Sequence, residues 1–462
     1  PVFLAKEKRG KHSERDVNGL EGRDPWGVVL VIEGRWYRRF TPEGERFYRE
    51  SLPLQAQLAA QNLWLLAGEP VGGQVELPVL ACLTYPWEWD WAGWQEAALS
   101  TLRIQKEALK AGWSLRDATP LNLTRQEGRM VWFDQLSLGP YQAGEPWKAY
   151  PEFVATFLAP LLLMAWRDRR LGKELLLYPQ GLPLDLVYSL LPGLRRWHPT
   201  ALIHLRLSRQ ASSRGTSAAE KISSRPTLST RRLLALVESL EADVQGLKPR
   251  YAPSPWEGYE GAACPYSERA QAHKQQTVAA WLERLAPRRG MDLGAHVGTY
   301  TRFLLAVAKE KVLALEQDAY ALDRLAASLA SSRLYPIWAD IAHPSPPVQL
   351  GGRTLPGLLE RLESSVEVVL ALALVHHLRL RSFLTFSVQA HRFAHCLEPG
   401  GHLIVEYVPP TDPMVRRLHS CPETFPDYSE EGFLAAMGTY FSLEAVERLP
   451  ESERSLYLFQ KR

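Results

Sequence analysis

A strand, a glycine-containing turn and a helix start follow one another between residues 289 and 300, in the stretch RGMDLGAHVGTY. Glycine adopts backbone angles that are closed to other residues, and it lets a ligand lie against bare backbone. The helix that begins near Thr299 leaves unpaired N–H groups in its first turn. The pattern indicates a ligand-binding turn in an α/β sheet, although a glycine turn in another kind of α/β domain has the same appearance.

The strand that follows indicates which class of ligand this turn would bind. A second strand, Lys311 to Leu315, is apolar after its lysine and is followed by Glu316, which is 316 − 292 = 24 residues after Asp292. An acidic residue at this strand end is placed to grip ribose hydroxyls in a doubly wound sheet. Gly294 and Gly298 form G-x-x-x-G and lack the G-x-G-x-x-G pattern that brings backbone up to a pyrophosphate. A nucleoside ligand without phosphates is therefore expected.

Three further features follow in order. Residues 334–338 are a third strand, and residues 366–375 form a nearly continuous apolar run bounded by charges. Such a run predicts a central strand buried on both faces. It leads into His376-His377, and a Leu-x-Pro-Gly-Gly turn at residues 397–401 precedes a fifth strand.

Together these features resemble class I S-adenosylmethionine (SAM)-dependent methyltransferases over about residues 262–462. The resemblance implies an α/β domain with a Rossmann-like seven-stranded methyltransferase sheet, and an enzyme that uses SAM as cofactor. In that family an acidic residue after the third strand binds the adenine amine and an apolar neighbour packs on the ring. Asp340 and Ile341 match those positions, although Asp also suits a turn or helix cap. The implied cofactor-binding residues are Asp292, Gly294, Ala295, Gly298, Glu316, Gln317, Asp340, Ile341 and Leu372.

His376 and His377 are the candidate catalytic residues. Ligands bind outside the carboxyl ends of the strands in such a sheet, so this pair is expected near the transferable methyl group. A histidine there has a pKa suited to a general base, or it caps the next helix or shapes the pocket. No cysteine lies in a strand-end motif and no N/D-P-P-Y follows the fourth strand. These absences argue against methylation of cytosine C5 or of DNA-base amines, and leave a small molecule, RNA or protein as acceptor.

A second resemblance lies in the first half of the chain. Asp117 is followed five residues later by Asn122, and Asp134 ends a strand twelve residues after that. The order resembles the catalytic loop and metal-binding strand end of protein kinases and aminoglycoside phosphotransferases. It implies an α+β kinase-like domain in which Asp117 orients an acceptor hydroxyl, and Asn122 and Asp134 hold magnesium with ATP.

This second resemblance has departures. No glycine-rich loop covers the phosphates, the strand that should carry a lysine offers only Arg38 or Arg39, and Asp134 precedes Gln-Leu where Phe-Gly is expected. Asp and Asn also favour turns for purely structural reasons.

Composition sets the remaining limits. The 462 residues suffice for two or three domains, and the formal charge of +3 gives no strong nucleic-acid signature. The four cysteines are far apart, which predicts reduced thiols and neither a metal site nor a disulfide frame. With no spanning apolar run and no signal-peptide pattern, we expect a cytoplasmic protein without a membrane partner. The predicted domains are a loose arm at 1–24, the kinase-like domain at 25–206, a flexible Ser/Arg-rich linker at 207–232 and the methyltransferase domain at 233–462.

Three hypotheses remain open from the sequence. The first is a methyltransferase, acting on an O, N or C centre, whose kinase-like module recognises the acceptor or regulates the reaction. The second is a bifunctional enzyme whose first domain is also an active ATP-dependent phosphotransferase. The third is a non-catalytic scaffold that binds SAM or a nucleotide. Under the first, alanine at Gly298 is expected to intrude on the cofactor and block its binding.

Overall fold

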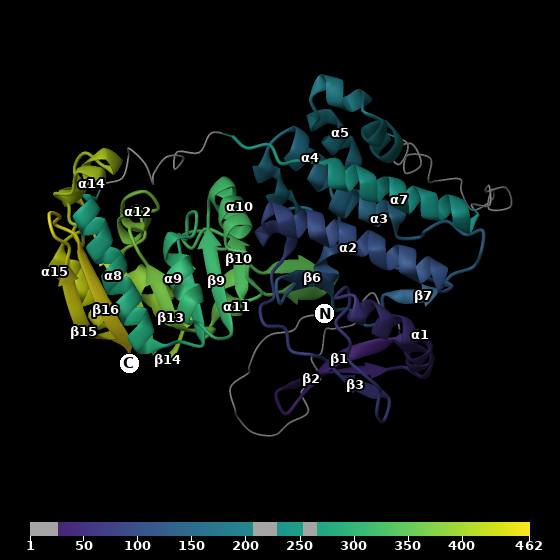
Figure 1. The fold of residues 1–462 in the computed structure, drawn as a ribbon, viewed down its shortest axis with the longest axis horizontal. Coiled ribbons are helices and arrows are strands. Elements are labelled where there is room, and N and C mark those ends of the chain that lie inside the picture. Colours follow the sequence, from purple (N-terminus) through teal and green to yellow (C-terminus); the bar gives the residue numbers. More distant parts are fainter. Residues whose placement is uncertain (1–25, 207–228, 253–265) are drawn as a thin grey trace. The chain divides into compact units, whose positions relative to one another are not determined.

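The computed structural model describes residues 26–206, 229–252 and 266–462. The predicted arm at 1–24 and most of the predicted linker at 207–232 lie outside these residues. Contacts divide the chain into two units (Figure 1), which we call unit 1 (1–252 and 348–355) and unit 2 (253–347 and 356–462). Within the described ranges, no helix is both long enough and apolar enough to span a bilayer.

Unit 1 begins with a three-stranded antiparallel sheet in the order β1-β2-β3. Its strands are β1 (Gly27–Ile32), β2 (Arg35–Phe40) and β3 (Gln74–Glu76). Helix α1 (Pro42–Ala60) follows β2, where Thr41 accepts a hydrogen bond from the Gly44 N–H and Pro42 occupies the first turn. This is the helix start that a Thr-Pro pair followed by acidic residues favours.

Two small antiparallel ladders lie beyond helix α2 (Trp91–Lys110). The first pairs β4 (Trp113–Leu115) with β7 (Leu138–Pro140), and the second pairs β5 (Leu123–Gln126) with β6 (Arg129–Trp132). The rest of unit 1 is helical, with short 3-10 and π segments between the α-helices. These elements are η1 (Pro86–Glu88), η2 (Pro120–Asn122), α3 (Tyr150–Phe153), η3 (Val154–Leu158), α4 (Ala159–Trp166), η4 (Arg169–Leu176), α5 (Leu184–Leu190), η5 (Gly193–Trp197), η6 (Ala201–Arg206) and α7 (Thr230–Gly246).

Helix α7 belongs to unit 1, whereas the sequence analysis assigns everything from residue 233 to the methyltransferase domain. The physical reason is the apolar face of α7, because Leu233, Val237 and Leu240 are buried in the core of unit 1. An ion pair of 2.5 Å between Lys106 on α2 and Glu241 on α7 joins the two helices at the edge of this contact.

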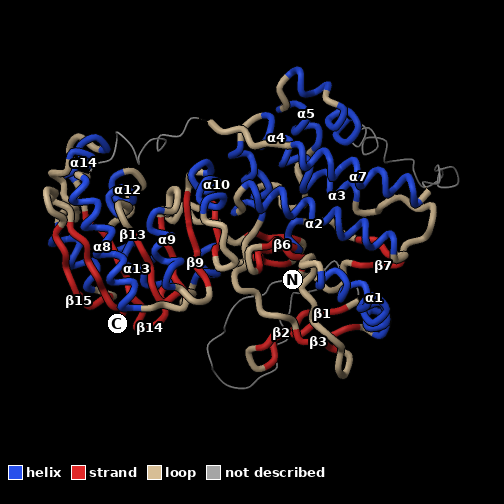
Figure 2. Tube along the Cα trace, viewed as in Figure 1, coloured by secondary structure: helices blue, strands red, loops and turns tan. Residues whose placement is uncertain are grey.

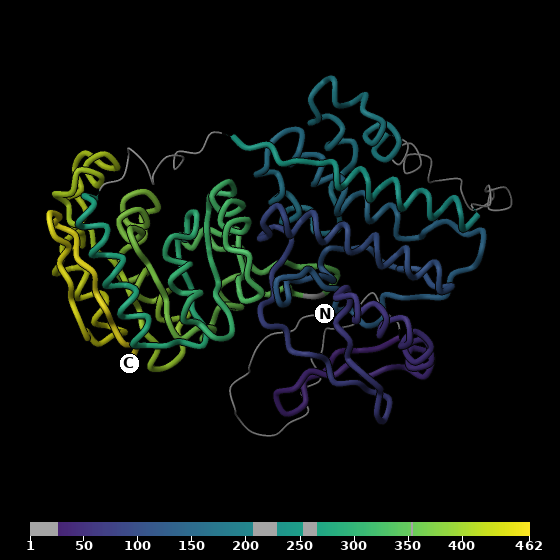
Figure 3. Tube along the Cα trace, in the orientation of Figure 1, coloured from purple at the N-terminus to yellow at the C-terminus, as the bar shows by residue number. Residues whose placement is uncertain are grey.

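A hairpin from the second half of the chain is also part of unit 1. Strands β11 (Val348–Leu350) and β12 (Arg353–Leu355) pair antiparallel, and Leu355 is buried in the core of unit 1. Figure 3 shows this green segment leaving the sheet of unit 2 and returning to it. The chain therefore passes between the units more than once, and no single cut separates them.

Unit 2 is built on a seven-stranded mixed sheet in the order β10-β9-β8-β13-β14-β16-β15, which agrees with the expected seven-stranded sheet. The first five strands of that order are mutually parallel, and β16 runs antiparallel to both of its neighbours. The strands are β8 (Arg289–Leu293), β9 (Lys311–Glu316), β10 (Leu334–Trp338), β13 (Val366–Ala371), β14 (Leu397–Tyr407), β15 (Phe441–Arg448) and β16 (Ser455–Lys461).

Helices cover the sheet of unit 2 on its two faces (Figure 2). Helix α8 packs on α9, which lies against β8 and β9, while α13 packs on α11 and α15 and lies against β13 and β14. Strand β13 is apolar except at Glu367, because its side chains alternate between these two helical layers. The helices are α8 (Glu268–Leu285), α9 (Thr299–Val307), α10 (Ala319–Ser328), α11 (Leu358–Leu362), α12 (Val375–Leu380), α13 (Phe386–Cys396), α14 (Pro413–Leu418), η8 (Pro422–Thr424) and α15 (Glu430–Gly438).

The turn after β8 requires left-handed backbone at Gly294 (φ +71°), His296 (φ +50°) and Gly298 (φ +94°). A Cβ on Gly298 would lie 2.6 Å from Leu329 Cδ1 and 3.0 Å from Leu325 Cγ. Gly298 is thus needed for the close packing of this turn on α10. This is a different reason from the intrusion on a ligand that the sequence suggests.

We predict that Gly298→Ala lowers the free energy of unfolding by roughly 2–4 kcal/mol, because the strained backbone and the overpacking add. Gly400→Ala is the matched control, since Gly400 has φ +74° and its Cβ would meet nothing within 4 Å. The control should lose only about 1 kcal/mol. Urea unfolding of both variants measures the difference, and equal losses would contradict the packing account.

Candidate functional site

The acidic residues singled out from the sequence meet at one edge of the sheet of unit 2. Asp292 lies near the end of β8, Glu316 ends β9 and Asp340 follows β10 by two residues. These strands are parallel neighbours, so their carboxyl ends share an edge. His376 and His377 begin helix α12, just after β13 on the other side of β8.

Glu316 is tied to the backbone by both of its carboxylate oxygens. Oε2 accepts the His296 N–H at 2.8 Å, and Oε1 accepts the Asp318 N–H at 2.7 Å. The side chain is 6% exposed, and burial raises its pKa to about 7 although those N–H groups favour the ionised form. Glu316 therefore fixes the glycine turn and is poised to change its charge near neutral pH.

Asp292 is buried beside helix α9. Its Oδ2 accepts a hydrogen bond from Thr301 Oγ1 at 2.6 Å, and burial raises its pKa to about 6. The hydrogen bond from Thr301 and the positive charge of Lys274 oppose that rise. Asp292 thus links the end of β8 to the first turn of the following helix.

The other predicted cofactor-binding residues differ in burial and in how far their polar groups are already hydrogen-bonded. The N–H groups of Gly294 and Ala295 both donate to the Leu315 carbonyl, at 2.9 and 3.0 Å, so they are used within the fold. Gln317 is exposed, and its carbonyl accepts the Trp338 Nε1–H at 3.0 Å. Ile341 and Leu372 are buried.

Asp340 caps the turn that it starts. Its Oδ1 accepts the Ala342 N–H at 2.8 Å, and its Oδ2 lies 2.9 Å from Nδ1 of the exposed His343. This is the capping role that the sequence analysis names as the alternative, and contact with an adenine amine stays a prediction.

The rings of His376 and His377 have centroids 4.2 Å apart and are tilted by 40° to one another. His376 is 1% exposed, and its Nδ1 has no hydrogen-bond partner among the described residues. Burial lowers the pKa of His376 well below its usual value, and the charges of Arg454 and Lys274 act in the same direction. Burial also lowers the pKa of His377 to about 4. Both rings are therefore neutral at physiological pH and can accept a hydrogen bond.

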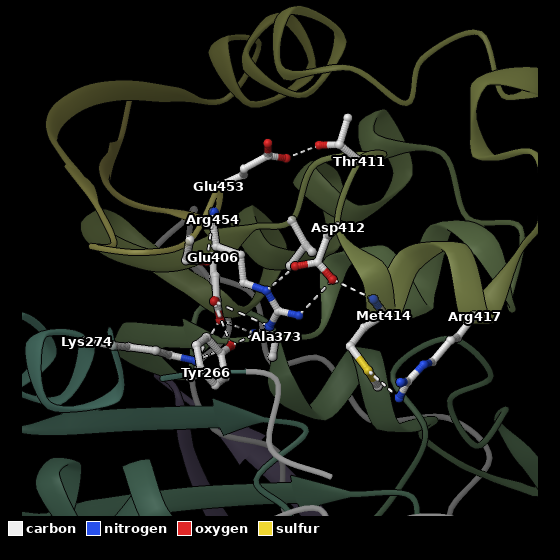
Figure 4. Close-up of polar contacts among 12 residues, drawn as sticks. Tyr266, Lys274, Ala373, Glu406, Thr411, Asp412, Met414, Arg417, Glu453 and Arg454 are labelled. Carbon is white, nitrogen blue, oxygen red and sulfur yellow. Dashed lines mark hydrogen bonds and ion pairs between the residues drawn. The ribbon is translucent and has the colours of Figure 1, made fainter. Parts of the chain in front are cut away.

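A buried ionic cluster, shown in Figure 4, lies beside this edge. Its centre is Glu406 near the end of β14, which is 0% exposed and accepts hydrogen bonds from Lys274 Nζ and the Tyr266 hydroxyl, each at 2.7 Å. Arg454 donates to the Tyr266 oxygen at 2.7 Å and forms a two-pronged pair with Asp412 at 2.7 and 3.1 Å. We call these five residues the Glu406 cluster.

The Glu406 cluster holds the loop that carries the histidines. Glu406 Oε2 also accepts the N–H of Ala373 at 2.8 Å, and Ala373 has a left-handed φ of +49°. Burial alone would raise the pKa of Glu406, but Lys274 and Arg454 outweigh that effect and hold the pKa below its usual value. The carboxylate therefore stays ionised and fixes the loop between β13 and α12.

The sequence analysis missed Glu406, Arg454 and Asp412. A signal for Glu406 was present, because it is an acidic residue at the end of an apolar strand, as Glu316 is. No local pattern marks Arg454 or Asp412, which reach the cluster from separate loops.

The predicted residues of unit 1 also come together. Asn122 Nδ2 donates to Asp117 Oδ2 at 2.8 Å, and Ser137 Oγ donates to Asp134 Oδ2 at 3.1 Å. Arg38, from the strand that the kinase resemblance expects to carry a lysine, donates to Asp134 Oδ1 at 2.5 Å. Both oxygens of Asp134 are thus engaged.

The carboxyl groups of Asp117 and Asp134 differ in their pKa. Burial raises the pKa of Asp117 to about 7, and the negative charges of Asp134 and Glu152 add to the effect. Burial alone would also raise the pKa of Asp134, but Arg38 outweighs it and the pKa lies below its usual value. Among the residues that the structure describes, no three His, Cys, Asp or Glu side chains are grouped as metal ligands.

We predict that Lys274→Met and Glu406→Gln each lower the free energy of unfolding by about 3–5 kcal/mol, because each leaves a buried charge without its partner. The double variant should lose less than the sum of the two. Arg269→Met on the same helix breaks only the exposed pair with Glu451 and should cost less than about 1 kcal/mol. Urea unfolding checks all four, and a Lys274→Met variant as stable as the control would contradict the cluster's role.

Known proteins resemble this chain either over about half of its length or less, or over nearly all of it. No protein-family model matches the chain. Among solved structures, N-methyltransferase NodS from Bradyrhizobium japonicum WM9 is 13% identical, covers 42% of this chain and 98% of its own, and has a TM-score of 0.32. The 1,6-didemethyltoxoflavin-N1-methyltransferase of Burkholderia thailandensis, solved with S-adenosylhomocysteine, is 14% identical, covers 46% and 92%, and has a TM-score of 0.31. Both are methyltransferases, and at these values no residue roles are carried across.

A curated relative matches along nearly the whole chain. Nodulation protein NoeA of Rhizobium meliloti (strain 1021) is 31% identical over 464 residues, which cover 95% of this chain and 95% of the relative. The match therefore includes both units. On this likeness, the chain belongs to the family of the nodulation protein NoeA.

Proposed function

We propose that this protein is a SAM-dependent methyltransferase. The observation that supports this most is the edge where parallel strands β8, β9 and β10 bring Asp292, Glu316 and Asp340 together beside a left-handed glycine turn. Asp292 and Glu316 are buried, and carboxylates at neighbouring strand ends suit a cationic ligand that also carries ribose hydroxyls.

The residues present fit that cofactor. Glu316 has both oxygens anchored by N–H groups, and a carboxylate oxygen can accept further hydrogen bonds from a ribose diol. Asp292 is a buried carboxylate whose ionised form a nearby sulfonium and ammonium would favour. When bound, SAM supplies an activated methyl group. The protein's own task is then to orient the acceptor and exclude water.

In this proposal His376 contacts the acceptor. Its buried, unpartnered Nδ1 is a hydrogen-bond acceptor suited to a hydroxyl or amine hydrogen. Arg454 and Lys274 make the imidazolium form costly, so His376 positions the acceptor better than it removes a proton. His377 lies against it, with the two rings tilted by 40°, and limits its rotation. The acceptor is an O, N or C centre of a small molecule, RNA or protein.

We further propose that unit 1 is a kinase-like module that recognises the acceptor or regulates the reaction. The residues that the kinase resemblance singled out converge around Asp134, which supports the likeness. The engaged oxygens of Asp134 favour recognition over phosphate transfer.

We predict that the full chain binds S-adenosylhomocysteine in isothermal calorimetry and that Glu316→Gln weakens binding at least about tenfold, because the ribose then loses a charged hydrogen-bond acceptor. Glu310→Gln is the matched control, since Glu310 precedes the same strand at the opposite edge of the sheet and pairs with Arg288. Binding by a folded Glu316→Gln variant equal to that of the control would count against this site.

Affinity should also depend on pH. Because the pKa of free Glu316 is raised to about 7 and ligand favours its ionised form, affinity should fall as pH drops below about 7 and level off above it. Asp292, with a pKa of about 6, should steepen the fall at lower pH. In Glu316→Gln the dependence near pH 7 should disappear, while a wild-type affinity that is flat through this range would contradict the assignment.

The second candidate is a bifunctional enzyme with phosphotransferase activity in unit 1, favoured by the convergence of Asp117, Asn122 and Asp134. We predict no magnesium-dependent ATP binding, because Arg38 and Ser137 already engage both oxygens of Asp134. Calorimetry with ATP, with and without magnesium, tests this. Magnesium-dependent binding that Asp134→Asn abolishes would establish the second candidate instead.

A further inference from the structure

Exposed apolar side chains are concentrated in one segment of unit 1. Of the fifteen large apolar side chains that are exposed among the described residues, five lie within residues 186–203. Leu194 is 90% exposed and Trp197 is 68% exposed. We call this group the apolar end, and its members are Leu186, Leu190, Leu194, Trp197 and Ile203.

The apolar end comes from elements that touch one another. Helix α5 contacts η6 and α4, and η5 contacts η6. Figure 1 shows α5 beyond α4, at one end of unit 1. Val187, Leu191 and Leu205 from these same elements are buried in the core. The segment is therefore anchored by one set of apolar residues while a second set faces outward.

The outward set has helical spacing. Leu186 and Leu190 are four residues apart on α5, and Leu194 and Trp197 are three apart on the 3-10 segment η5. These spacings place each pair on one side of its helix. Single exposed apolar residues need no explanation, but a cluster of this kind marks an interaction surface.

The charge along the apolar end is mainly positive. Residues 186–206 contain Arg195, Arg196 and Arg206 and no acidic residue. Arg195 and Arg206 are exposed, while Arg196 donates to the carbonyls of Ser189 and Leu191 and so closes the end of α5. Two acidic residues adjoin it: Asp185, which is exposed at the start of α5 and directly precedes Leu186, and Asp243 on α7, which lies 3.7 Å from the buried His204.

We propose that the apolar end docks unit 1 on the surface of an anionic membrane. Leucine and tryptophan side chains enter the boundary between headgroups and acyl chains, and arginines pair with anionic headgroups. A second copy of the chain fits less well, because a two-fold interface would bring the same arginines face to face. The contact is peripheral, in keeping with the absence of a spanning helix from the described ranges.

The test is co-sedimentation of the full-length chain with vesicles of phosphatidylcholine alone or mixed with phosphatidylglycerol, at low and high salt. We expect binding to the mixed vesicles, weakening at high salt, and little binding to phosphatidylcholine alone. The double variant Leu194→Ser/Trp197→Ser should bind the mixed vesicles at least about tenfold more weakly.

Val79→Ser is the matched control, because Val79 is 74% exposed in unit 1 but lies outside this segment. It should bind vesicles like wild type. Unchanged urea-unfolding midpoints and S-adenosylhomocysteine affinity would show that the double variant is folded. The proposal fails if wild type ignores mixed vesicles, or if a folded double variant binds as wild type does. It also fails if light scattering shows a dimer that the double variant dissolves, since the apolar end would then join two copies.

Discussion

Parallel pairing of β8 with β9 and β13 is the constraint on which the candidate site depends. Parallel strands end at the same edge, so residues far apart in the chain are delivered to one place without any direct bond between them. Asp292, Glu316 and the pair His376-His377 share no hydrogen bond with one another in the described contacts. Their proximity is a property of the sheet, and the apolar strands that hold it together are as important to the site as the polar residues themselves.

The Glu406 cluster shows how the loops above that edge are fixed. The buried carboxylate of Glu406 is tolerated because two cations and a hydroxyl surround it. The same carboxylate accepts the N–H of Ala373 and so holds that residue's loop in a left-handed turn. Burial is the main reason that the pKa of His376 is lowered, and the same two cations act in the same direction. The Glu406 cluster thus holds the loop that carries the histidines and adds to the effect of burial on His376, so the role of hydrogen-bond acceptor suits His376 better than that of general base.

Unit 1 has two notable features, which are the buried polar contacts around Asp134 and the exposed side chains of the apolar end. Arg38 donates a hydrogen bond to Asp134, the residue at which the kinase resemblance would put a metal. The β11–β12 hairpin lies between two segments of unit 2 in the sequence, but it belongs to unit 1, where Leu355 is buried in the core. The match to NoeA covers 95% of this chain, so family membership extends to both units.

The sequence by itself determined the sheet of unit 2 and the strand-end acids, because apolar runs, glycine turns and terminal carboxylates are local patterns. It also brought out Asp117, Asn122 and Asp134, whose spacing is local. Tertiary structure alone decided the rest. Helix α7 joined unit 1 because its apolar face fits α2, Gly298 proved to face Leu325 and Leu329, and Arg454 and Asp412 reached Glu406 from distant loops. Such contacts depend on which surfaces meet in space, and no spacing along the chain encodes that directly.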